Sequence, residues 1–241
     1  MGMTVCTVSG KGGTGKSTVS SGLGIAAALL GKKVLLIDLD SGLRCLDMMF
    51  GIDQNVVFDL NDALDELNLQ KAVYRAAEYP GIDVIPAPAK AENIDFLKLY
   101  RCVENAKKYY DYVILDFPAG VDFDNYNIFS SAFFLIVSGA DDVSTRDAAV
   151  ISRGISSDLP PRLIINRFDI DMLKTGMHKN IDAIIDTSLT RLIGIVPADG
   201  ELLLLSRNHK LKPKGRAARA FIRILKRISG ENVPLPKLKK I

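Results

Sequence analysis

The sequence has few cysteines and no long apolar run, and each shortage excludes a class of protein. Cys6, Cys45 and Cys102 show no C-x-x-C spacing, so neither a disulfide framework nor a zinc site is indicated. We therefore expect free thiols in a reducing compartment. Apolar runs such as residues 132–137 are far too short to span a bilayer, which takes about 20 residues.

Histidine is also scarce. His178 and His209 belong to no metal or catalytic motif, and we interpret both as surface residues. No charged and apolar signal pattern opens the chain, and a glycine-rich loop already begins at Gly10, so no cleaved signal is expected. The protein is expected in the cytoplasm. With 241 residues, 48% hydrophobic and 24% charged, the chain has the composition of a globular protein.

Charge is unevenly distributed along the chain. The net charge of +3 hides a basic end, because residues 207–241 contain twelve Lys or Arg and one acid, Glu231. That segment carries +11, and the preceding 206 residues carry −8. The basic end predicts contact with an anionic surface, of a membrane or of nucleic acid.

The loop from Gly10 to Ser17 reads G-K-G-G-T-G-K-S and matches G-x-x-x-x-G-K-[ST]. It lies between a strand predicted over residues 3–8 and a helix predicted over 18–30, as this motif requires. The glycines let a phosphate lie on the backbone, so that successive N–H groups and the helix N-terminus point at the anion. Lys16 would add a charge at the outer phosphates, and Ser17 a hydroxyl for Mg²⁺.

The alternative is a glycine-rich turn with two solvated lysines. The flanking strand and helix disfavour it, and it does not explain Lys11. A loop that already holds Lys16 needs no second charge for its own phosphates. The candidate nucleotide-binding residues of this loop are Gly10, Lys11, Gly12, Gly13, Thr14, Gly15, Lys16, Ser17 and Thr18.

Apolar, β-branched segments alternate with helical patterns throughout the chain, which predicts βαβ units. We expect one α/β domain over residues 1–241, a doubly wound, mostly parallel sheet with helices on both faces and its ligand at the carboxyl ends of the strands. The predicted strands cover residues 3–8, 33–39, 82–86, 112–116, 132–138, 162–166 and 192–196. Longer helices are predicted over residues 57–67, capped by Asn55, and over 91–110, 141–156 and 214–228.

Three aspartates fall where such a fold places phosphate chemistry. Asp116 ends a predicted strand and fits a role in holding Mg²⁺, although a capping side chain would look the same. Asp38 and Asp40 are two apart at the end of another strand. We expect Asp40 to orient the attacking water or the Mg²⁺ shell and Asp38 to support the site from behind. The alternative is that both are polar residues at the end of a buried strand, without a catalytic role.

Residues 11–18, K-G-G-T-G-K-S-T, resemble the deviant phosphate loop K-G-G-x-G-K-[ST] of the MinD/ParA ATPases. The resemblance implies a P-loop ATPase fold, ATP or ADP with Mg²⁺ as ligands, and catalytic roles for Lys11, Lys16 and Asp40. In that family the extra lysine reaches the phosphates held by a partner subunit. If this holds for Lys11, ATP would join two copies of the chain and hydrolysis would separate them.

The segment Asp38 to Asp47, D-L-D-S-G-L-R-C-L-D, resembles the MinD switch I more than that of the ParA partition proteins. Cys45 stands where the family has Asn, and a thiol is a poorer hydrogen-bond partner than an amide. We expect this difference to affect the rate of hydrolysis or its stimulation and to leave nucleotide binding unchanged. Residues 117–120 resemble switch II. The resemblance further implies that Asn166, Arg167, Pro197 and Asp199 contact the base, Asn166 by both donating to and accepting from adenine. The resemblance extends from Met3 to about Leu205. We expect Mg²⁺ to be held by Ser17, Asp40 and Asp116.

Residues 214–229 predict a basic amphipathic helix, and residues 230–241 a short basic tail. Such a helix can lie on an anionic membrane or pack on the sheet with a solvated basic back, and we favour packing. Pro234 and Pro236 prevent a helix before Lys237, so only weak attraction to lipid is expected from the tail. This is the largest departure from MinD, whose anchor is a short amphipathic segment at the C-terminus.

Three functions remain in view. The first is a slow Mg²⁺-dependent ATPase and ATP-driven dimerisation switch, peripheral to the membrane, accelerated by a partner protein because no intrinsic arginine finger is evident. The second is a ParA-like partition ATPase that binds nonspecific DNA; no helix-turn-helix or aromatic stacking pattern supports sequence reading. The third is a nucleotide-gated binding module with little hydrolysis, for which Cys45 is the only hint.

Overall fold

A sheet of eight strands organises the computed structural model, which describes residues 2–205 and 210–237. Its order is β3-β4-β2-β5-β1-β6-β7-β8, and every neighbouring pair is parallel except β3 and β4. The strands are β1 (Met3–Val8), β2 (Val34–Asp38), β3 (Tyr74–Arg75), β4 (Ile82–Ile85), β5 (Tyr112–Asp116), β6 (Phe133–Ser138), β7 (Arg162–Phe168) and β8 (Arg191–Pro197).

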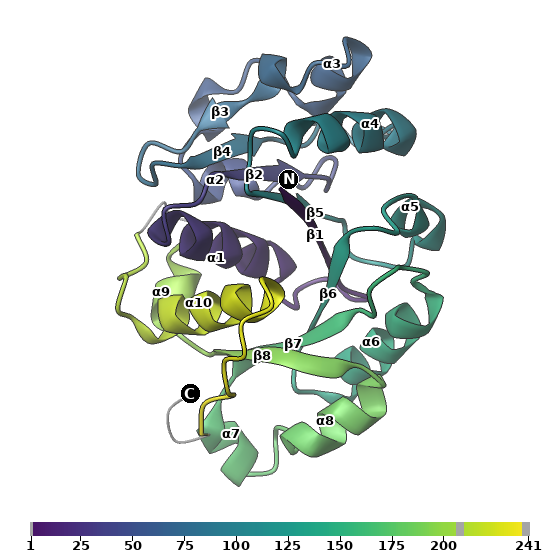
Figure 1. Cartoon of the computed structure of the whole chain (residues 1–241). Coiled ribbons are helices and arrows are strands. Elements are labelled where there is room, and N and C mark those ends of the chain that lie inside the picture. The colour runs from purple at the N-terminus through teal and green to yellow at the C-terminus, as the bar shows by residue number, and fades with distance from the viewer. Residues whose placement is uncertain (1, 206–209, 238–241) are drawn as a thin grey trace.

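Helices cover both faces of this sheet (Figure 1). One apolar core lies under α1, α2, α9 and α10, and the other under α3, α4, α5, α6 and α8. The helices are α1 (Lys16–Leu29), α2 (Leu46–Met49), α3 (Leu60–Asp65), α4 (Phe96–Ala106), α5 (Phe123–Ile128), α6 (Asp142–Gly154), α7 (Ile170–Lys174), α8 (Ile181–Ser188), α9 (Gly200–Leu203) and α10 (Arg216–Ile228). The predicted doubly wound α/β architecture is confirmed.

Strand β1 lies at the point where the direction of winding reverses. It pairs with β5 on one side and β6 on the other. The chain first builds β2, β3 and β4 on one side, returns through β5 next to β1, and then crosses to β6, β7 and β8 on the other side. The loops after β1 and β6 therefore diverge at the carboxyl edge and leave a crevice, which is where this class of fold binds ligands.

Two helices begin later than the apolar pattern predicts. Helix α3 starts at Leu60, and its N-cap is Asp59 and not Asn55 as expected. Asp59 accepts hydrogen bonds from the first turn while Asp62 accepts one from the Asp59 N–H. Likewise Asp95 caps α4, so the helix predicted from residue 91 starts at Phe96 and ends at Ala106. In both places an aspartate that satisfies the free N–H groups of the first turn sets the boundary.

Among the strands and α-helices of the described residues, three short elements were not predicted. Strand β3 has two residues, and α5 and α7 have six and five. Segments of this length show no period that separates them from loops. Their aspartate caps, Asp122 before α5 and Asp169 before α7, are the signal that could have found the two helices.

The C-terminal helix packs on the sheet, as predicted. Its apolar stripe is buried against α1 and β8, and Gly230 follows its last turn in a left-handed conformation with φ 90°. Beyond it, the Arg227 guanidinium donates hydrogen bonds to the carbonyls of Ile193, Val233 and Pro234 at 2.7, 2.7 and 2.8 Å. The start of the tail is thus fastened beside β8 and is not helical.

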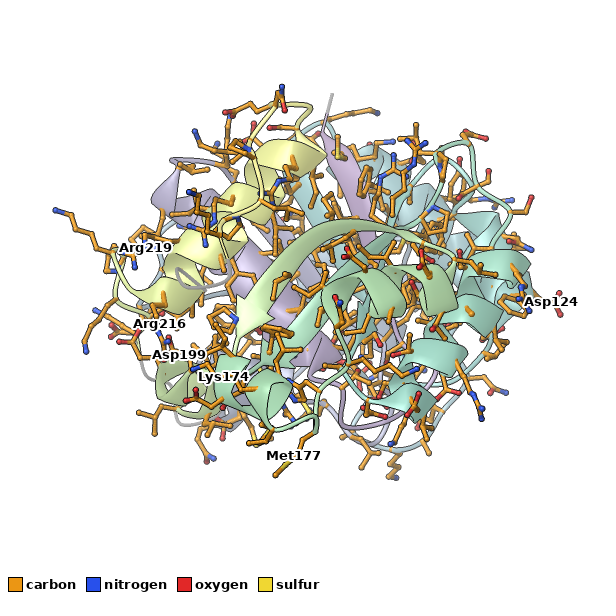
Figure 2. All side chains as sticks on the ribbon, turned by 90° about the horizontal axis from the view of Figure 1, so that it is seen from below. Asp124, Lys174, Met177, Asp199, Arg216 and Arg219 are labelled. Atoms are coloured by element: carbon orange, nitrogen blue, oxygen red, sulfur yellow. The ribbon has the colours of Figure 1, made fainter. Side chains whose placement is uncertain are left out.

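The outer side of α10 is basic. Arg216 and Arg219 lie at the edge of the molecule on the same side as Asp199 (Figure 2). Part of the tail predicted to attract lipid, residues 238–241, lies outside the described residues, as does His209. No helix within the described ranges combines the length and the apolar character that a transmembrane span requires.

Candidate nucleotide site

The structure brings the predicted site residues together at the carboxyl edge of the sheet. The parallel strands all end there, so side chains far apart in the sequence converge. The contributions are the loop after β1, Asp40 after β2, Asp116 at the end of β5, Asn166 and Arg167 in β7, Pro197 at the end of β8, and Asp199 at the N-cap of α9.

The glycine-rich loop turns sharply before α1. Gly13 and Gly15 both have a left-handed backbone, with φ 82° and 83°, and Gly15 is the N-cap of α1. A Cβ atom on Gly15 would lie 2.2 Å from Asn166 Nδ2. Glycine is therefore required at this position both for its backbone conformation and for the close approach of β7.

Lys16 is held inside its own chain by Asp116. Its ammonium lies 3.0 Å from Asp116 Oδ1, in an ion pair that solvent hardly reaches. The same oxygen accepts hydrogen bonds from the hydroxyls of Ser20 and Thr7 at 2.8 and 3.1 Å, and these two hydroxyls lie 2.6 Å apart. Sequence reasoning missed Thr7 and Ser20, since a hydroxyl in a strand or helix interior carries no motif.

The other oxygen of Asp116 is available. Oδ2 is buried and has no hydrogen-bond partner among the described residues. Ser17 in the first turn of α1 and Asp40 after β2 line one cavity with Lys16, the residue that Asp116 pairs with. The donor set is therefore hydroxyl and carboxylate oxygen, which suits Mg²⁺. No group of three or more His, Cys, Asp or Glu in the described part of the chain forms a metal cage by itself. The residues thus fit a Mg²⁺ that is also held by phosphate and water.

Asp38 organises the loop that follows β2. Oδ1 accepts from the Asp40 N–H at 3.0 Å, and Oδ2 accepts from the N–H groups of Cys45 and Leu46 at 2.9 and 3.1 Å. Burial, and after it the charge of Asp116, raises the pKa of Asp38 to about 7 despite these three hydrogen bonds. Burial also raises the pKa of Asp40, against the opposing charge of Lys16.

Cys45 takes part in this loop mainly through its backbone. Its thiol donates to the Leu43 carbonyl at 3.2 Å, and burial followed by the charge of Asp38 raises the pKa of the thiol. Next to it, Arg44 makes a 2.8 Å ion pair with the buried Asp47. All three cysteines are free, as predicted.

Lys11 differs from Lys16 in its surroundings. Its side chain is exposed and lines an open cavity of about 970 Å³ that also contains Lys16, Asp40 and Pro118. No carboxylate of the described residues lies within ion-pair distance of its ammonium. Burial pushes the pKa of Asp141 up, but two hydrogen bonds from Ser144 and the charge of Lys11 bring that pKa below its ordinary value.

A second cavity, of about 590 Å³, lies beside α7 and α9. Its lining is largely apolar, as a base would need. The lining residues include Thr18, Asn166, Arg167, Met172, His178, Pro197, Asp199 and Leu202. Asp199 is already engaged, because it caps α9 and lies 3.9 Å from Arg216. His178 was expected at the surface but is only partly exposed and packs 5.6 Å from the Phe168 ring.

Asn166 and Arg167 turn toward the glycine-rich loop. Asn166 Nδ2 donates to the Thr14 carbonyl at 2.8 Å and lies 3.4 Å from the Gly15 carbonyl. Arg167 Nη1 donates to the Gly13 carbonyl at 3.0 Å. The donor end of Asn166 is therefore occupied, and only its acceptor, Oδ1, remains for a base, in contrast to the double role expected from the sequence.

Fold and loop together define a P-loop nucleotide-binding protein: a doubly wound sheet, a phosphate loop at its switch point, and a carboxylate opposite the lysine. Comparison with known proteins gives the family. The family model of the CobQ/CobB/MinD/ParA nucleotide binding domain matches residues 5–211. The chain belongs to this family.

Individual relatives agree. The septum site-determining protein MinD of Bacillus subtilis is 35% identical over 252 residues, covering 100% of this chain and 94% of the relative. The structure of a MinC:MinD cell division protein complex from Aquifex aeolicus has a TM-score of 0.87 at 33% identity and covers 98% of both chains. MinD from Pyrococcus horikoshii, complexed with Mg-ADP, has a TM-score of 0.78 at 24% identity over 95% of this chain and 96% of that one, which supports the fold.

Proposed function

We propose that this protein is a Mg²⁺-dependent ATPase that works as an ATP-driven dimerisation switch, as part of division-site placement or related spatial regulation. The observation that carries the proposal is Lys11. It is an exposed cation in a phosphate loop whose own lysine, Lys16, is already buried beside Asp116. An exposed lysine at the mouth of the phosphate cavity can reach a triphosphate held by a second copy.

Within one chain, each polar group has a distinct task. Lys16 exchanges its contact with Asp116 for one with the phosphates, while Thr7 and Ser20 continue to bind Asp116 Oδ1. Ser17, Asp40 and Asp116 would hold Mg²⁺, directly or through water. Bound Mg²⁺ neutralises charge that develops on the phosphates. Asp40 orients the attacking water.

Turnover is expected to be slow until a partner protein binds. Among the described arginines, Arg44 and Arg167 line the phosphate cavity, and both are already engaged, Arg44 with Asp47 and Arg167 with the Gly13 carbonyl. The Aquifex relative is seen in complex with MinC, and we propose that this chain also has a protein partner. We place it in the cytoplasm, with weak peripheral contact to the inner face of the membrane through its basic C-terminus.

Mixing two inactive variants tests whether Lys11 acts across a dimer. Lys11→Ala and Asp40→Ala each lack one group of every homodimeric site. In a mixed dimer, the nucleotide site of the Lys11→Ala chain is complete, because this chain has its own Asp40 and the Asp40→Ala chain supplies Lys11. The site of the Asp40→Ala chain lacks both groups. A mixed dimer has one working site of two. Because Lys11→Ala lacks a bridging lysine and pairs less readily than the native chain, phosphate release should recover to at most about a quarter of the native rate, the value that random pairing would give.

Two outcomes contradict the proposal. No recovery on mixing would mean that Lys11 acts in its own chain or not at all. Unchanged phosphate release in Asp40→Ala alone, with an unchanged lifetime of the ATP-bound dimer, would favour a nucleotide-gated module that barely hydrolyses.

A ParA-like function is the second candidate, because the outer side of α10 carries Arg219 and Arg223, for which no ion pair is found among residues 2–205 and 210–237. Arg219 and Arg223 lie four apart on this helix, and burial followed by the charge of Arg219 lowers the pKa of Arg223. ATP-dependent DNA binding that falls steeply with salt would support this candidate. ATP-dependent sedimentation with anionic liposomes, without DNA binding, would support the membrane-linked switch.

A further inference from the structure

Two side chains of β7 hold three consecutive carbonyls of the phosphate loop. Asn166 binds the Thr14 carbonyl and lies close to that of Gly15, and Arg167 binds that of Gly13. Asn166 is 1% exposed, so its hydrogen bond is shielded from water. Arg167 has a left-handed backbone with φ 54°, an uncommon conformation for a residue other than glycine, which directs its side chain onto the loop.

Holding these carbonyls fixes the direction of the loop's N–H groups. In each peptide unit the C=O and the N–H point in opposite directions. With the carbonyls of Gly13 and Thr14 directed at β7, the N–H groups of residues 14 and 15 point away from β7. The Gly15 carbonyl mainly accepts the helical hydrogen bond from the Val19 N–H at 3.0 Å. These are the donors that bind phosphate in a loop followed by a helix.

The loop needs such support. Gly13 and Gly15 adopt left-handed conformations, and glycine loses more conformational freedom on ordering than any other residue. A loop that is ordered before the ligand arrives does not lose this freedom on binding, so its affinity is higher.

We infer that Asn166 and Arg167 are positioning residues for the phosphate loop, in addition to any contact with the base. They keep the loop in its anion-binding shape in the absence of a nucleotide. The inference rests on the nucleotide binding proposed above. It predicts that both residues affect ligands that have no base at all.

Binding of ADP and of inorganic tripolyphosphate, each with Mg²⁺, separates the two roles. Titration calorimetry is done with the native protein, Asn166→Ala, Asn166→Asp and Met172→Ala. Met172 lines the base cavity and makes no hydrogen bond to the loop, so it is the matched control. We expect Asn166→Ala to bind both ligands about tenfold more weakly, the equivalent of one buried hydrogen bond. Asn166→Asp keeps the shape and Oδ1, loses the donor and adds a negative charge beside the loop, so it should weaken both ligands more than Asn166→Ala.

Met172→Ala should weaken ADP alone. An Asn166→Ala protein that binds tripolyphosphate like the native protein, and ADP more weakly, would overturn the inference and leave Asn166 as a residue of the base site. Native protein that binds ADP but no tripolyphosphate would also overturn it. Native protein that binds neither ligand would instead contradict the proposed function.

Hydrogen exchange on the unliganded proteins gives a readout without any ligand. In Asn166→Ala and in Arg167→Gly, the amides of residues 12–16 should exchange at least several-fold faster than in the native protein. Amides of β1 and α10 should be unchanged, which shows that the variants are folded. Equal exchange in the loop of all three proteins would contradict a positioning role.

Discussion

Replacing either member of the Lys16 and Asp116 pair should destabilise the unliganded protein, and replacing both should cost about as much as replacing one. Asp116→Asn keeps the shape of the side chain but leaves the Lys16 ammonium, 6% exposed, without its counter-charge. Lys16→Met leaves the Asp116 carboxylate with only the hydroxyls of Thr7 and Ser20. The double variant contains no unpaired charge.

The size of the effect follows from the geometry. At 3.0 Å and an effective dielectric constant of about 20, the attraction between the two charges is about 5 kcal/mol. Desolvation of both groups offsets part of it, whereas removing one partner of a buried pair costs about 3–5 kcal/mol. We therefore expect each single variant to lower the free energy of unfolding by about 3 kcal/mol, and the coupling between them to be about 2–3 kcal/mol.

Urea unfolding of the native protein and the three variants measures this coupling. The chain has no tryptophan, so far-UV circular dichroism is the signal. Single effects that simply add, with a coupling below about 0.5 kcal/mol, would refute the statement that the pair is a buried charge interaction. Saturating ADP should reduce the cost of Asp116→Asn, since a phosphate replaces the missing counter-charge of Lys16.

Three further predictions concern the site. Ser20→Ala should weaken Mg²⁺ binding to the ADP complex about tenfold, because it loosens Asp116. Ser21→Ala should not, because the Ser21 hydroxyl lies 3.1 Å from Met49 Sδ and makes no hydrogen bond to Asp116; equal Mg²⁺ titrations of the two variants would contradict this. Gly15→Ala should abolish ADP binding, because a Cβ would lie 2.2 Å from Asn166 Nδ2 and alanine would have to adopt a φ of 83°; calorimetry is the check, and ADP binding like that of the native protein would contradict this. Asp38 has a pKa of about 7 against 3.8 when unfolded, so the folded state binds more protons and stability should fall as pH rises from about 4 to about 7, by up to about 4 kcal/mol. Unfolding of Asp38→Asn at the two ends of this range should show a smaller fall than the native protein, and an equal or larger one would exclude Asp38 as the cause.

The architecture was predictable because its signals are local. The strands β1, β2, β5, β6, β7 and β8 are apolar runs buried on both faces, and the phosphate loop has a fixed spacing between strand and helix. The sequence also placed Asp40, Asp116 and Asn166 at strand ends, which the sheet then gathers at one edge.

The rest depends on contacts between segments that are far apart. The hydrogen bonds from Thr7 and Ser20 to Asp116 join residues about one hundred positions apart and follow no spacing rule. The link from Asn166 to Thr14 spans about 150 residues, and it changes the chemistry left for the base. Helix starts were misplaced where Asp59 and Asp95 compete with apolar residues upstream, because a cap is a single side chain and the apolar pattern covers many.

Multi-angle light scattering in ADP and in ATP tests the central claim, that a triphosphate joins two copies of this chain through Lys11. We predict a monomer in ADP, a dimer in ATP, and a monomer in both nucleotides for Lys11→Ala. Lys33→Ala removes an exposed lysine at the opposite edge of the sheet and should behave like the native protein. A native protein that stays monomeric in ATP, or a Lys11→Ala protein that dimerises as the native one does, would contradict the account.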